Sequence, residues 1–572
     1  MMIEQQIISH LPYQEPFLFV DELTAISSEG ITGNYTFTKE AFFYDGHFKD
    51  NPITPGVILT ECMAQIGLVC LGIYLLKDEL ISANPKIALT SSQIDFFIPV
   101  LPGEKVTVIS EKEVFRFNKL KCNVKLLNEK GELVCRGKIS GMIAANQWYM
   151  KNRVVITGLG VVAPNGVGLE AFSKAIKNGE SGISYHPQLA DLNFSCCIGG
   201  IPQISEDKKL EYLTPLQLRG FNSSGILYGC MAGIDAWQDA GLKVDSNSAL
   251  DVHSGTVFGT GTSGVEKFRE AIYKLDDKHV KRLGSTVVVQ TMASGISAFL
   301  GGILGLGNQV TTNSSACTTG TEAIVMGYER IKNGQAKRML VGSCSDDGPY
   351  IWGGFDAMRV MTYKHNETPE KGSRPMSASA SGFVPGSGAG ALVLESLDSA
   401  LARNATIYAE VLGGNVNSGG HRNGGTMTAP NAEAVQRCIK DAMTNAAISP
   451  NAIDTINGHL TATSKDGLEI ENWTKALERS GNGFPYINSL KSMIGHCLAA
   501  AGSIEAVATV LQLKEQFVFP NINCEDVHPE IAALISKEKI VTHPLKTDLN
   551  IAVKASFGFG DVNGCVIFKR YT

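Results

Sequence analysis

The chain has 572 residues, which is too long for one hydrophobic core and indicates roughly two to four domains. The composition fits a soluble globular protein, and the net charge of −6 without a basic run argues against nucleic-acid binding. The 13 cysteines form no CxxC pair, so we expect reduced thiols in a cytoplasmic protein rather than a secreted disulfide framework.

An apolar run at residues 56–76 is long enough to span a membrane. Glu61 lies inside it, where an ionisable group is costly unless it has a function. Strand-like segments follow directly, and a helix that is apolar on nearly all sides can be wrapped by a sheet. We therefore predict a buried helix and no membrane span, with Thr54 as its N-cap and Pro55 at its first position. The N-terminus shows no signal-peptide pattern.

Strand candidates follow this helix at residues 86–90, 93–100, 104–114, 119–127 and 132–140. Residues 128–131 (Asn-Glu-Lys-Gly) favour a hairpin turn between the last two candidates. One long helix followed by a meander predicts a small α+β domain at residues 1–146, with the sheet curled around the helix.

Two residues of this domain carry candidate chemistry. Glu61, buried in an apolar helix, should have a raised pKa and could stay protonated as a general acid. His47 precedes the helix and could act as the base. The alternative is a structural Glu61 capped by backbone groups and an exposed His47.

A family pattern surrounds these residues. It comprises Leu11–Asp21 (LPYQEPFLFVD), Gly46–Phe48, Pro55-Gly56 and Glu61 with Ala64-Gln65. Residues 1–146 thereby resemble a FabZ-type 3-hydroxyacyl-acyl carrier protein dehydratase of the hot-dog fold. The resemblance implies that His47 removes the C2 proton, Glu61 protonates or holds the leaving hydroxyl, and the Gly56 amide polarises the thioester carbonyl. It also implies a homodimer, because the family takes its His and Glu from different subunits.

Composition changes after Gln147, and Met150 begins a stretch typical of the start of a separate protein. We interpret Met150 as the former initiator of a fused gene. Residues 150–572 are rich in Gly, with alternating strand and Ala-rich helix signals, which is an α/β pattern. Residues 259–264 match GxGxxG, but this motif alone is a weak indicator, and we interpret it as an ordinary Gly-rich loop.

Cys317 lies among small residues between a strand end at 310–312 and a helix predicted for 318–332, with the next strand at 338–342. A helix N-terminus favours an anion, so the pKa of this thiol should fall. The alternative is a small buried hydrophobe, which is the role of most free cysteines.

Three later segments favour the interpretation of Cys317 as a nucleophile. His459 follows a strand-like segment, His496 precedes an Ala-rich stretch, and Ser556–Gly560 is a Gly-interrupted turn. With Cys317, these segments make residues 150–572 resemble a FabF-type β-ketoacyl-acyl carrier protein synthase of the thiolase fold, an α/β fold with αβαβα layers.

The resemblance implies that Cys317 accepts the acyl chain as a thioester. His459 and His496 would stabilise the enolate formed when a malonyl thioester loses carbon dioxide. The amides of Cys317 and Phe559 would form a second oxyanion hole, and the Phe559 ring would gate the acyl pocket.

Further positions match supporting roles of the family. Thr461 and Thr463 would hydrogen-bond the pantetheine arm, and Lys491 would support the histidines with Glu469 as its partner. The Glu469 assignment assumes a one-residue deletion, and Leu460 replaces the family's usual glycine.

Together these segments predict a bifunctional enzyme acting on chains carried by the phosphopantetheine of acyl carrier protein, with no bound cofactor or metal. No reductase motif is present, so a separate ketoreductase is expected as a partner. Return of the enoyl product to Cys317 would give a conjugated polyene. The alternative is ordinary fatty-acid synthesis, with the hot-dog domain mainly a dimerisation module. A non-catalytic length-setting subunit and a thiolase are further alternatives. Arg219, with Lys208 and Lys209, is the candidate carrier-protein dock.

Overall fold

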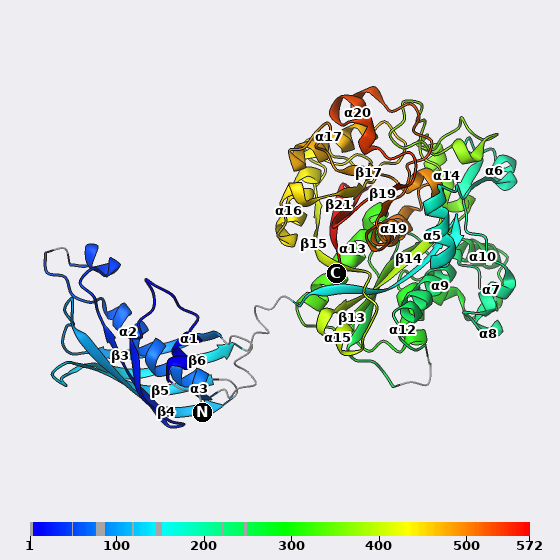
Figure 1. The fold of residues 1–572 in the computed structure, drawn as a ribbon. Coiled ribbons are helices and arrows are strands. Elements are labelled where there is room, and N and C mark those ends of the chain that lie inside the picture. The colour runs from blue at the N-terminus through cyan, green and yellow to red at the C-terminus, as the bar shows by residue number, and fades with distance from the viewer. Residues whose placement is uncertain are drawn as a thin grey trace. The chain divides into compact units, whose positions relative to one another are not determined.

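The computed structural model describes residues 4–48, 50–75, 86–116, 119–144, 152–219, 221–244 and 249–572. The chain forms two compact units, Met1–Lys151 and Asn152–Thr572 (Figure 1). Gln147 and Met150, where we predicted a gene-fusion junction, lie outside the described residues.

The N-terminal unit is a six-stranded antiparallel sheet packed on one long helix. The strand order is β1-β2-β4-β5-β6-β3. These strands are β1 (Glu22–Ile26), β2 (Gly30–Thr36), β3 (Lys86–Phe96), β4 (Lys105–Arg116), β5 (Lys119–Asn128) and β6 (Leu133–Ala144). Residues of β5 alternate between buried and exposed, so one face of the sheet covers the helix. A short helix α1 (Glu4–Ser9) precedes the sheet.

The helix consists of α2 (Gly56–Ala64), a π-helical segment η2 (Gln65–Cys70) and α3 (Leu71–Leu75). It is long and apolar enough to cross a membrane, but 72% of its apolar window is buried inside the unit, as expected for a core helix. Strands β2, β4, β5 and β6 all contact the η2 segment. This burial supports the predicted core helix over a membrane span.

Two local predictions for this unit are wrong. The segments 86–90 and 93–100 are not separate strands, because β3 covers the first and continues into the second as far as Phe96, with a bulge between Leu89 and Ser91. The helix starts at Gly56 with Pro55 as N-cap, one residue later than predicted. Thr54 does not cap it, and its hydroxyl instead lies 2.6 Å from the Tyr44 hydroxyl.

The C-terminal unit is built from two half-sheets with the same topology. One half has the order β7-β14-β13-β11-β12 and the other β15-β21-β20-β16-β17, and β7 joins them by pairing with β15. Numbered within its half, each reads 1-5-4-2-3, with two antiparallel pairs followed by two parallel pairs. The halves are therefore a structural duplication, although no short-period sequence repeat reveals it.

The strands of the first half are β7 (Val154–Ala163), β11 (Ser254–Thr260), β12 (Val310–Thr311), β13 (Arg338–Ser345) and β14 (Gly388–Ser396). Those of the second are β15 (Ala409–Ser418), β16 (Thr455–Asn457), β17 (Tyr486–Asn488), β20 (Ile551–Gly558) and β21 (Val562–Arg570). Short strands β8 (Gly166–Val167), β9 (Ile183–Tyr185), β10 (Ile198–Gly200), β18 (Phe517–Val518) and β19 (Leu545–Lys546) lie outside this repeat.

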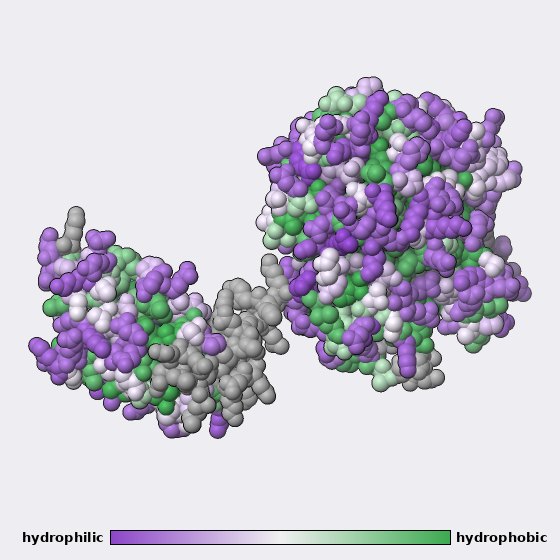
Figure 2. Space-filling model, in the orientation of Figure 1, coloured by the Kyte–Doolittle hydropathy of each residue, from purple (hydrophilic) through white to green (hydrophobic). Residues whose placement is uncertain are grey.

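Helices form three layers around the half-sheets. Helices α13 (Thr319–Lys332) and α19 (Ala501–Glu515) pack together in the middle and contact strands of both halves (Figure 1). Helices α9 (Ser224–Asp239) and α12 (Gly295–Leu304) cover one outer face, and α16 (Ala432–Ala446) with α17 (Asp466–Leu477) covers the other. This αβαβα arrangement confirms the predicted thiolase fold. Hydrophilic residues cover most of the visible face of this unit (Figure 2).

The remaining helices are shorter or peripheral. They are α5 (Leu169–Asn178), α6 (Pro187–Asp191), α7 (Glu206–Leu210), α8 (Pro215–Leu218), α10 (Val265–Asp276), α11 (Val287–Thr291), α14 (Pro349–Ala357), α15 (Leu397–Ala402), α18 (Lys491–Ile494) and α20 (Pro529–Leu534).

Glycines let the two central helices touch at their N-terminal ends. A Cβ at Gly320 would lie 2.3 Å from the Ser503 amide nitrogen, and one at Gly502 would lie 2.6 Å from that of Thr321. Only residues without a side chain permit this approach. It brings together the turns that precede α13 and α19, which carry Cys317 and His496.

Candidate active site

Cys317 lies in a single 3-10 turn, η5 (Ala316–Thr318), between β12 and α13. Ala316 adopts the left-handed region with φ of 48°, which turns the chain sharply before the thiol. The side chain stays partly exposed, whereas the other cysteines of the described residues are buried.

The predicted fall in the pKa of Cys317 is wrong. Burial raises it to about 11, while the Lys491 charge and the Phe559 amide act in the opposite direction. The thiol is therefore protonated at neutral pH and needs a base to become a nucleophile.

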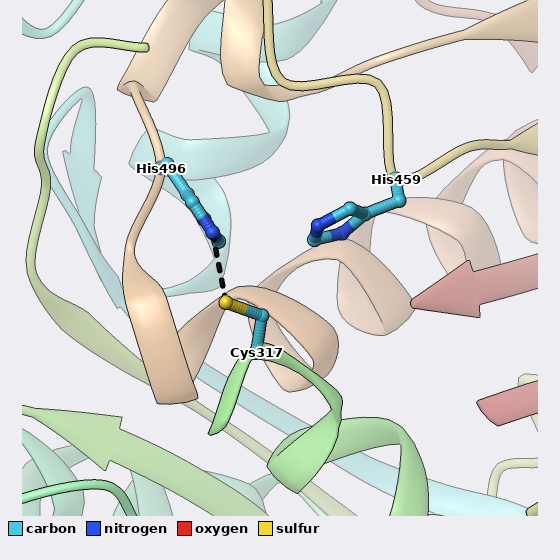
Figure 3. A group of neighbouring side chains, drawn as sticks. All are labelled: Cys317, His459 and His496. Atoms are coloured by element: carbon cyan, nitrogen blue, oxygen red, sulfur yellow. Dashed lines mark hydrogen bonds between the residues drawn. The ribbon is translucent and has the colours of Figure 1, made fainter. Parts of the chain in front are cut away.

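His496 is placed to be that base. Its Nε2 lies 3.1 Å from Cys317 Sγ, marked by the dashed line in Figure 3. His496 stands between α18 and a second 3-10 turn, η8 (Leu498–Ala500), and its backbone amide donates to the Val384 carbonyl over 2.7 Å.

His459 completes the group from the loop after β16. Its ring centroid lies 5.4 Å from that of His496, with the planes nearly perpendicular at 84°, and it points toward the thiol (Figure 3). The sulfur and one nitrogen of each ring lie within 4.8 Å of one another. Three residues that are far apart in sequence thus converge on one point. Such a set could also ligate a metal ion, which would block the thiol.

Both imidazoles are held neutral. Burial lowers their pKa values well below the usual range, and the nearby Lys491 charge lowers them further. A neutral imidazole carries one N–H and one acceptor nitrogen. Each ring can therefore either take a proton or donate a hydrogen bond to an oxyanion.

Glu469 supports the His459 loop through its backbone. Its two carboxylate oxygens accept the amides of His459 and Leu460 over 2.7 and 2.8 Å. The predicted Glu469–Lys491 pair is wrong, because Lys491 Nζ binds Glu505 Oε1 at 2.5 Å instead. Burial raises the pKa of Glu469 to about 7.

Thr461 and Thr463 lie side by side on the same loop. Their hydroxyls are 3.1 Å apart. The buried carboxylate of Asp466 fixes the loop by accepting the amides of Thr461 and Ala462 over 3.0 and 3.1 Å. The two hydroxyls could therefore serve one extended ligand, and their role in binding pantetheine stays a prediction.

Phe559 follows β20 in the turn predicted from the sequence. Its backbone amide is close enough to Cys317 to stabilise a thiolate. Its ring lies 6.0 Å from that of Phe355, which in turn contacts Phe383 at 5.6 Å. The Phe383 ring lies 5.4 Å from that of His496. Aromatic side chains thus line the space beside the thiol.

The sequence analysis missed two charged residues next to the site, Glu505 and Lys554. Both are fully buried and joined at 2.8 Å. The available signal was an ionisable residue inside a largely apolar part of a helix or strand, as with Glu61 in the N-terminal unit.

The GxGxxG segment joins β11 to α10, and its surroundings argue against a phosphate site. A Cβ at Gly259 would lie 2.1 Å from the Thr319 side chain, so this glycine serves packing. The Asp346 carboxylate already accepts the Val265 amide at the start of α10, over 3.4 Å. A carboxylate at that position repels an anion.

In the N-terminal unit, His47 Nδ1 lies 3.0 Å from the Ile53 carbonyl oxygen, and Gly56 is the first residue of α2. Glu61 Oε1 accepts a hydrogen bond of 3.0 Å from Gln65, a buried residue that the sequence analysis left without a role. Gln65 also accepts the Phe19 amide over 2.8 Å. Among the described residues, no hydrogen bond joins His47 to Glu61.

Known family models match both units. Residues 151–400 match the model of the β-ketoacyl synthase N-terminal domain, 408–525 that of its C-terminal domain, and 11–139 that of the FabA-like domain. The 3-oxoacyl-acyl-carrier-protein synthase 2 of Vibrio harveyi is 34% identical over 425 residues, covering 73% of this chain and 99% of that protein.

Solved structures agree. A β-ketoacyl synthase from Burkholderia phymatum STM815 is 29% identical with a TM-score of 0.67, and the match covers 74% of this chain and 100% of that one. A chain from a type II polyketide acyl-carrier protein in complex with its hexaketide-bound ketosynthase is 28% identical with a TM-score of 0.64, at the same coverage. The chain therefore belongs to the β-ketoacyl-acyl carrier protein synthase family and carries a FabA-like domain at its N-terminus.

Proposed function

We propose that the C-terminal unit condenses acyl chains carried on the phosphopantetheine of acyl carrier protein, with Cys317 as nucleophile. The 3.1 Å contact between Cys317 Sγ and His496 Nε2, with His459 facing both, carries this proposal. His496 takes the thiol proton while the sulfur attacks the acyl thioester. The pantetheine thiol leaves with a proton, and the chain remains on Cys317. No metal or bound cofactor is needed for this step.

The second half-reaction uses the same histidines as hydrogen-bond donors. Loss of carbon dioxide from a malonyl thioester leaves an enolate, and N–H groups of His459 and His496 stabilise its oxygen. The enolate carbon attacks the acyl thioester and releases the Cys317 thiolate. Amides of Cys317 and Phe559 are suited to the tetrahedral oxyanion, while Phe559 gates the acyl pocket. Thr461 and Thr463 hold the pantetheine arm.

Intact-mass measurement tests the nucleophile. The wild-type protein incubated with acyl-loaded carrier protein should gain the mass of one acyl group per chain, and Cys317→Ala should gain none. An adduct that persists in Cys317→Ala would exclude the assignment and favour a non-catalytic length-setting role.

For the N-terminal unit we propose dehydration of 3-hydroxyacyl chains on the same carrier protein. His47 removes the C2 proton, Glu61 gives a proton to the hydroxyl that leaves as water, and the Gly56 amide polarises the carbonyl. As the resemblance to the dehydratase family implies, we propose that two copies pair and that each site takes His47 from one copy and Glu61 from the other. His47→Ala should abolish hydration and dehydration. Full activity in that variant would favour the alternative of a dimerisation module in ordinary fatty-acid synthesis.

Together we propose that the two activities build a conjugated polyene in the cytoplasm, with a separate ketoreductase acting between them. Purified protein with malonyl carrier protein, a ketoreductase and a primer should form multi-enoyl chains without an enoyl reductase. Absence of any conjugated product would overturn this. Lys208 and Lys209 are each paired with an acidic residue of their own segment, which leaves Arg219 as the stronger candidate in the proposed carrier-protein dock.

A further inference from the structure

Lys554 is a buried cation that the condensing chemistry above does not use. It lies in β20, every residue of which is buried, and its own side chain is fully buried. Its Nζ lies 2.8 Å from Glu505 Oε2 and 3.2 Å from Ser556 Oγ, and it also contacts the Ala555 carbonyl. A buried ammonium is costly unless it is paired, so its presence in an apolar strand requires a reason.

Glu505 bridges two lysines. Its Oε1 is paired with Lys491 and its Oε2 with Lys554, and all three side chains are almost completely buried. With all three ionised, the cluster carries one more positive than negative charge. Burial lowers the pKa of Lys554, and the Glu505 charge opposes that shift. The Glu505 carboxylate therefore helps to keep Lys554 protonated in its buried position.

The cluster lies where the elements of the active site meet. In the register of β16 with β20, Lys554 is opposite Asn457, two residues before His459. Glu505 is on α19, which follows His496, and β20 itself ends just before Phe559. Ser556, which also contacts Lys554, has its hydroxyl 2.9 Å from the hydroxyl of Thr321. Thr321 lies in α13, one helical turn after Cys317.

This placement exposes both histidines to the charge of Lys554. The charged and titratable groups around the two rings are Lys491, Lys554, Glu505, Glu469, the Cys317 thiol and the other imidazole. After burial, the Lys491 and Lys554 charges both lower the pKa of each histidine. Lys554 thus adds to the effect of Lys491.

We propose that Lys554 is a positioning residue for condensation: it fixes Glu505, and through it Lys491, next to the histidines, and it adds to the positive charge that both imidazoles face. The proposal rests on the proposed function of Cys317, His459 and His496. Lys554 touches no reacting atom and acts through its neighbours. Its removal should therefore change the pH dependence of the reaction, which a purely structural residue would not do.

The test is the pH profile of malonyl carrier-protein decarboxylation for Lys554→Met. Removing a cation raises the histidine pKa values, so the imidazoles become protonated at higher pH and the acid limb moves upward. We expect a shift of about one pH unit, which lowers activity about tenfold on the acid limb and leaves activity at alkaline pH nearly normal. Lys554→Arg should restore much of the profile, and Lys546→Met, at an exposed lysine of β19, should leave it unchanged.

The rate at which iodoacetamide alkylates Cys317, measured by mass spectrometry over a range of pH, provides a second readout that does not need turnover. In Lys554→Met its profile should shift in the same direction, because His496 accepts the thiol proton. An equal loss at every pH, or no change, would overturn the role of Lys554. Failure of the proposed function itself is distinguished by the absence of an acyl adduct on wild-type Cys317.

Discussion

At the scale of single residues, the site depends on neutral groups made reactive by their neighbours. Cys317 is protonated at neutral pH because burial raises its pKa to about 11, and His496 is uncharged because its pKa is lowered. The pair can therefore transfer a proton only when an electrophile is attacked. A neutral pair also avoids an exposed thiolate, which is the form that oxidants attack.

His459→Ala should lower condensation about 10²–10³-fold by removing one donor to the enolate oxygen. Acylation of Cys317 should persist, because the proton acceptor His496 remains 3.1 Å from the sulfur. Intact mass measures acylation, and product formation measures condensation. His543→Ala, at an exposed histidine, is the matched control. Equal losses of both steps in His459→Ala would contradict the division of roles.

The pH dependence of acylation follows from the same shifts. A histidine whose pKa is lowered stays neutral as the pH falls through its ordinary value of 6.5. The rate of Cys317 acylation should therefore stay nearly constant between about pH 8 and pH 6.5, and fall only at lower pH. Single-turnover acylation followed by mass across this range checks it. An inflection near pH 6.5 would show that His496 is not shifted.

At the scale of elements, the C-terminal unit repeats one arrangement of strands and helix in each half-sheet. Each half-sheet ends its third strand next to a 3-10 turn and a central helix, so η5 with α13 in one half matches η8 with α19 in the other. The first residue of each turn, Ala316 or Leu498, is a non-glycine in the left-handed region. The site thus lies where equivalent turns of two halves meet.

Gly320→Ala should destabilise the C-terminal unit by about 1–3 kcal/mol, because the new Cβ would overlap backbone of α19. It should also slow acylation by moving η5 away from η8. Gly302→Ala in α12, where a Cβ meets nothing within 4 Å, should be neutral or slightly stabilising. Urea unfolding followed by tryptophan fluorescence is suitable, since Trp237, Trp352 and Trp473 report on this unit. Equal stability of the two variants would show that the helices can separate without cost.

Patterns in the sequence predict helices and turns well where they depend on neighbouring residues. The helix predicted at 318–332 is α13 (Thr319–Lys332), and the predicted hairpin turn at 128–131 joins β5 to β6. Contacts between residues that are distant in sequence leave no such local pattern. Nothing near Lys491 in sequence indicates Glu505 as its partner, and the Cys317–His496 contact spans 179 residues. Family resemblance predicted that triad, whereas spacing alone left Cys317 ambiguous.

At the scale of the whole molecule, each unit has a core of its own. The cluster around Ile66, Leu68 and Val124 belongs to the N-terminal unit, and separate clusters stabilise the C-terminal one. A substitution in one site should therefore leave the other folded. Carrier protein is the shared substrate that connects the two proposed activities.

A mixture of the His47→Ala and Cys317→Ala proteins tests how far the two sites depend on one chain. Each variant alone should form no polyene, since one lacks the dehydration base and the other the acyl acceptor. Because intermediates are carried on a separate protein, the mixture should restore conjugated product, measured by ultraviolet–visible absorbance and mass of the carrier-bound chain. Cys317→Ala should retain full dehydration of a 3-hydroxyacyl carrier protein. A mixture without product, while both single activities persist, would instead require that intermediates pass between sites within one assembly.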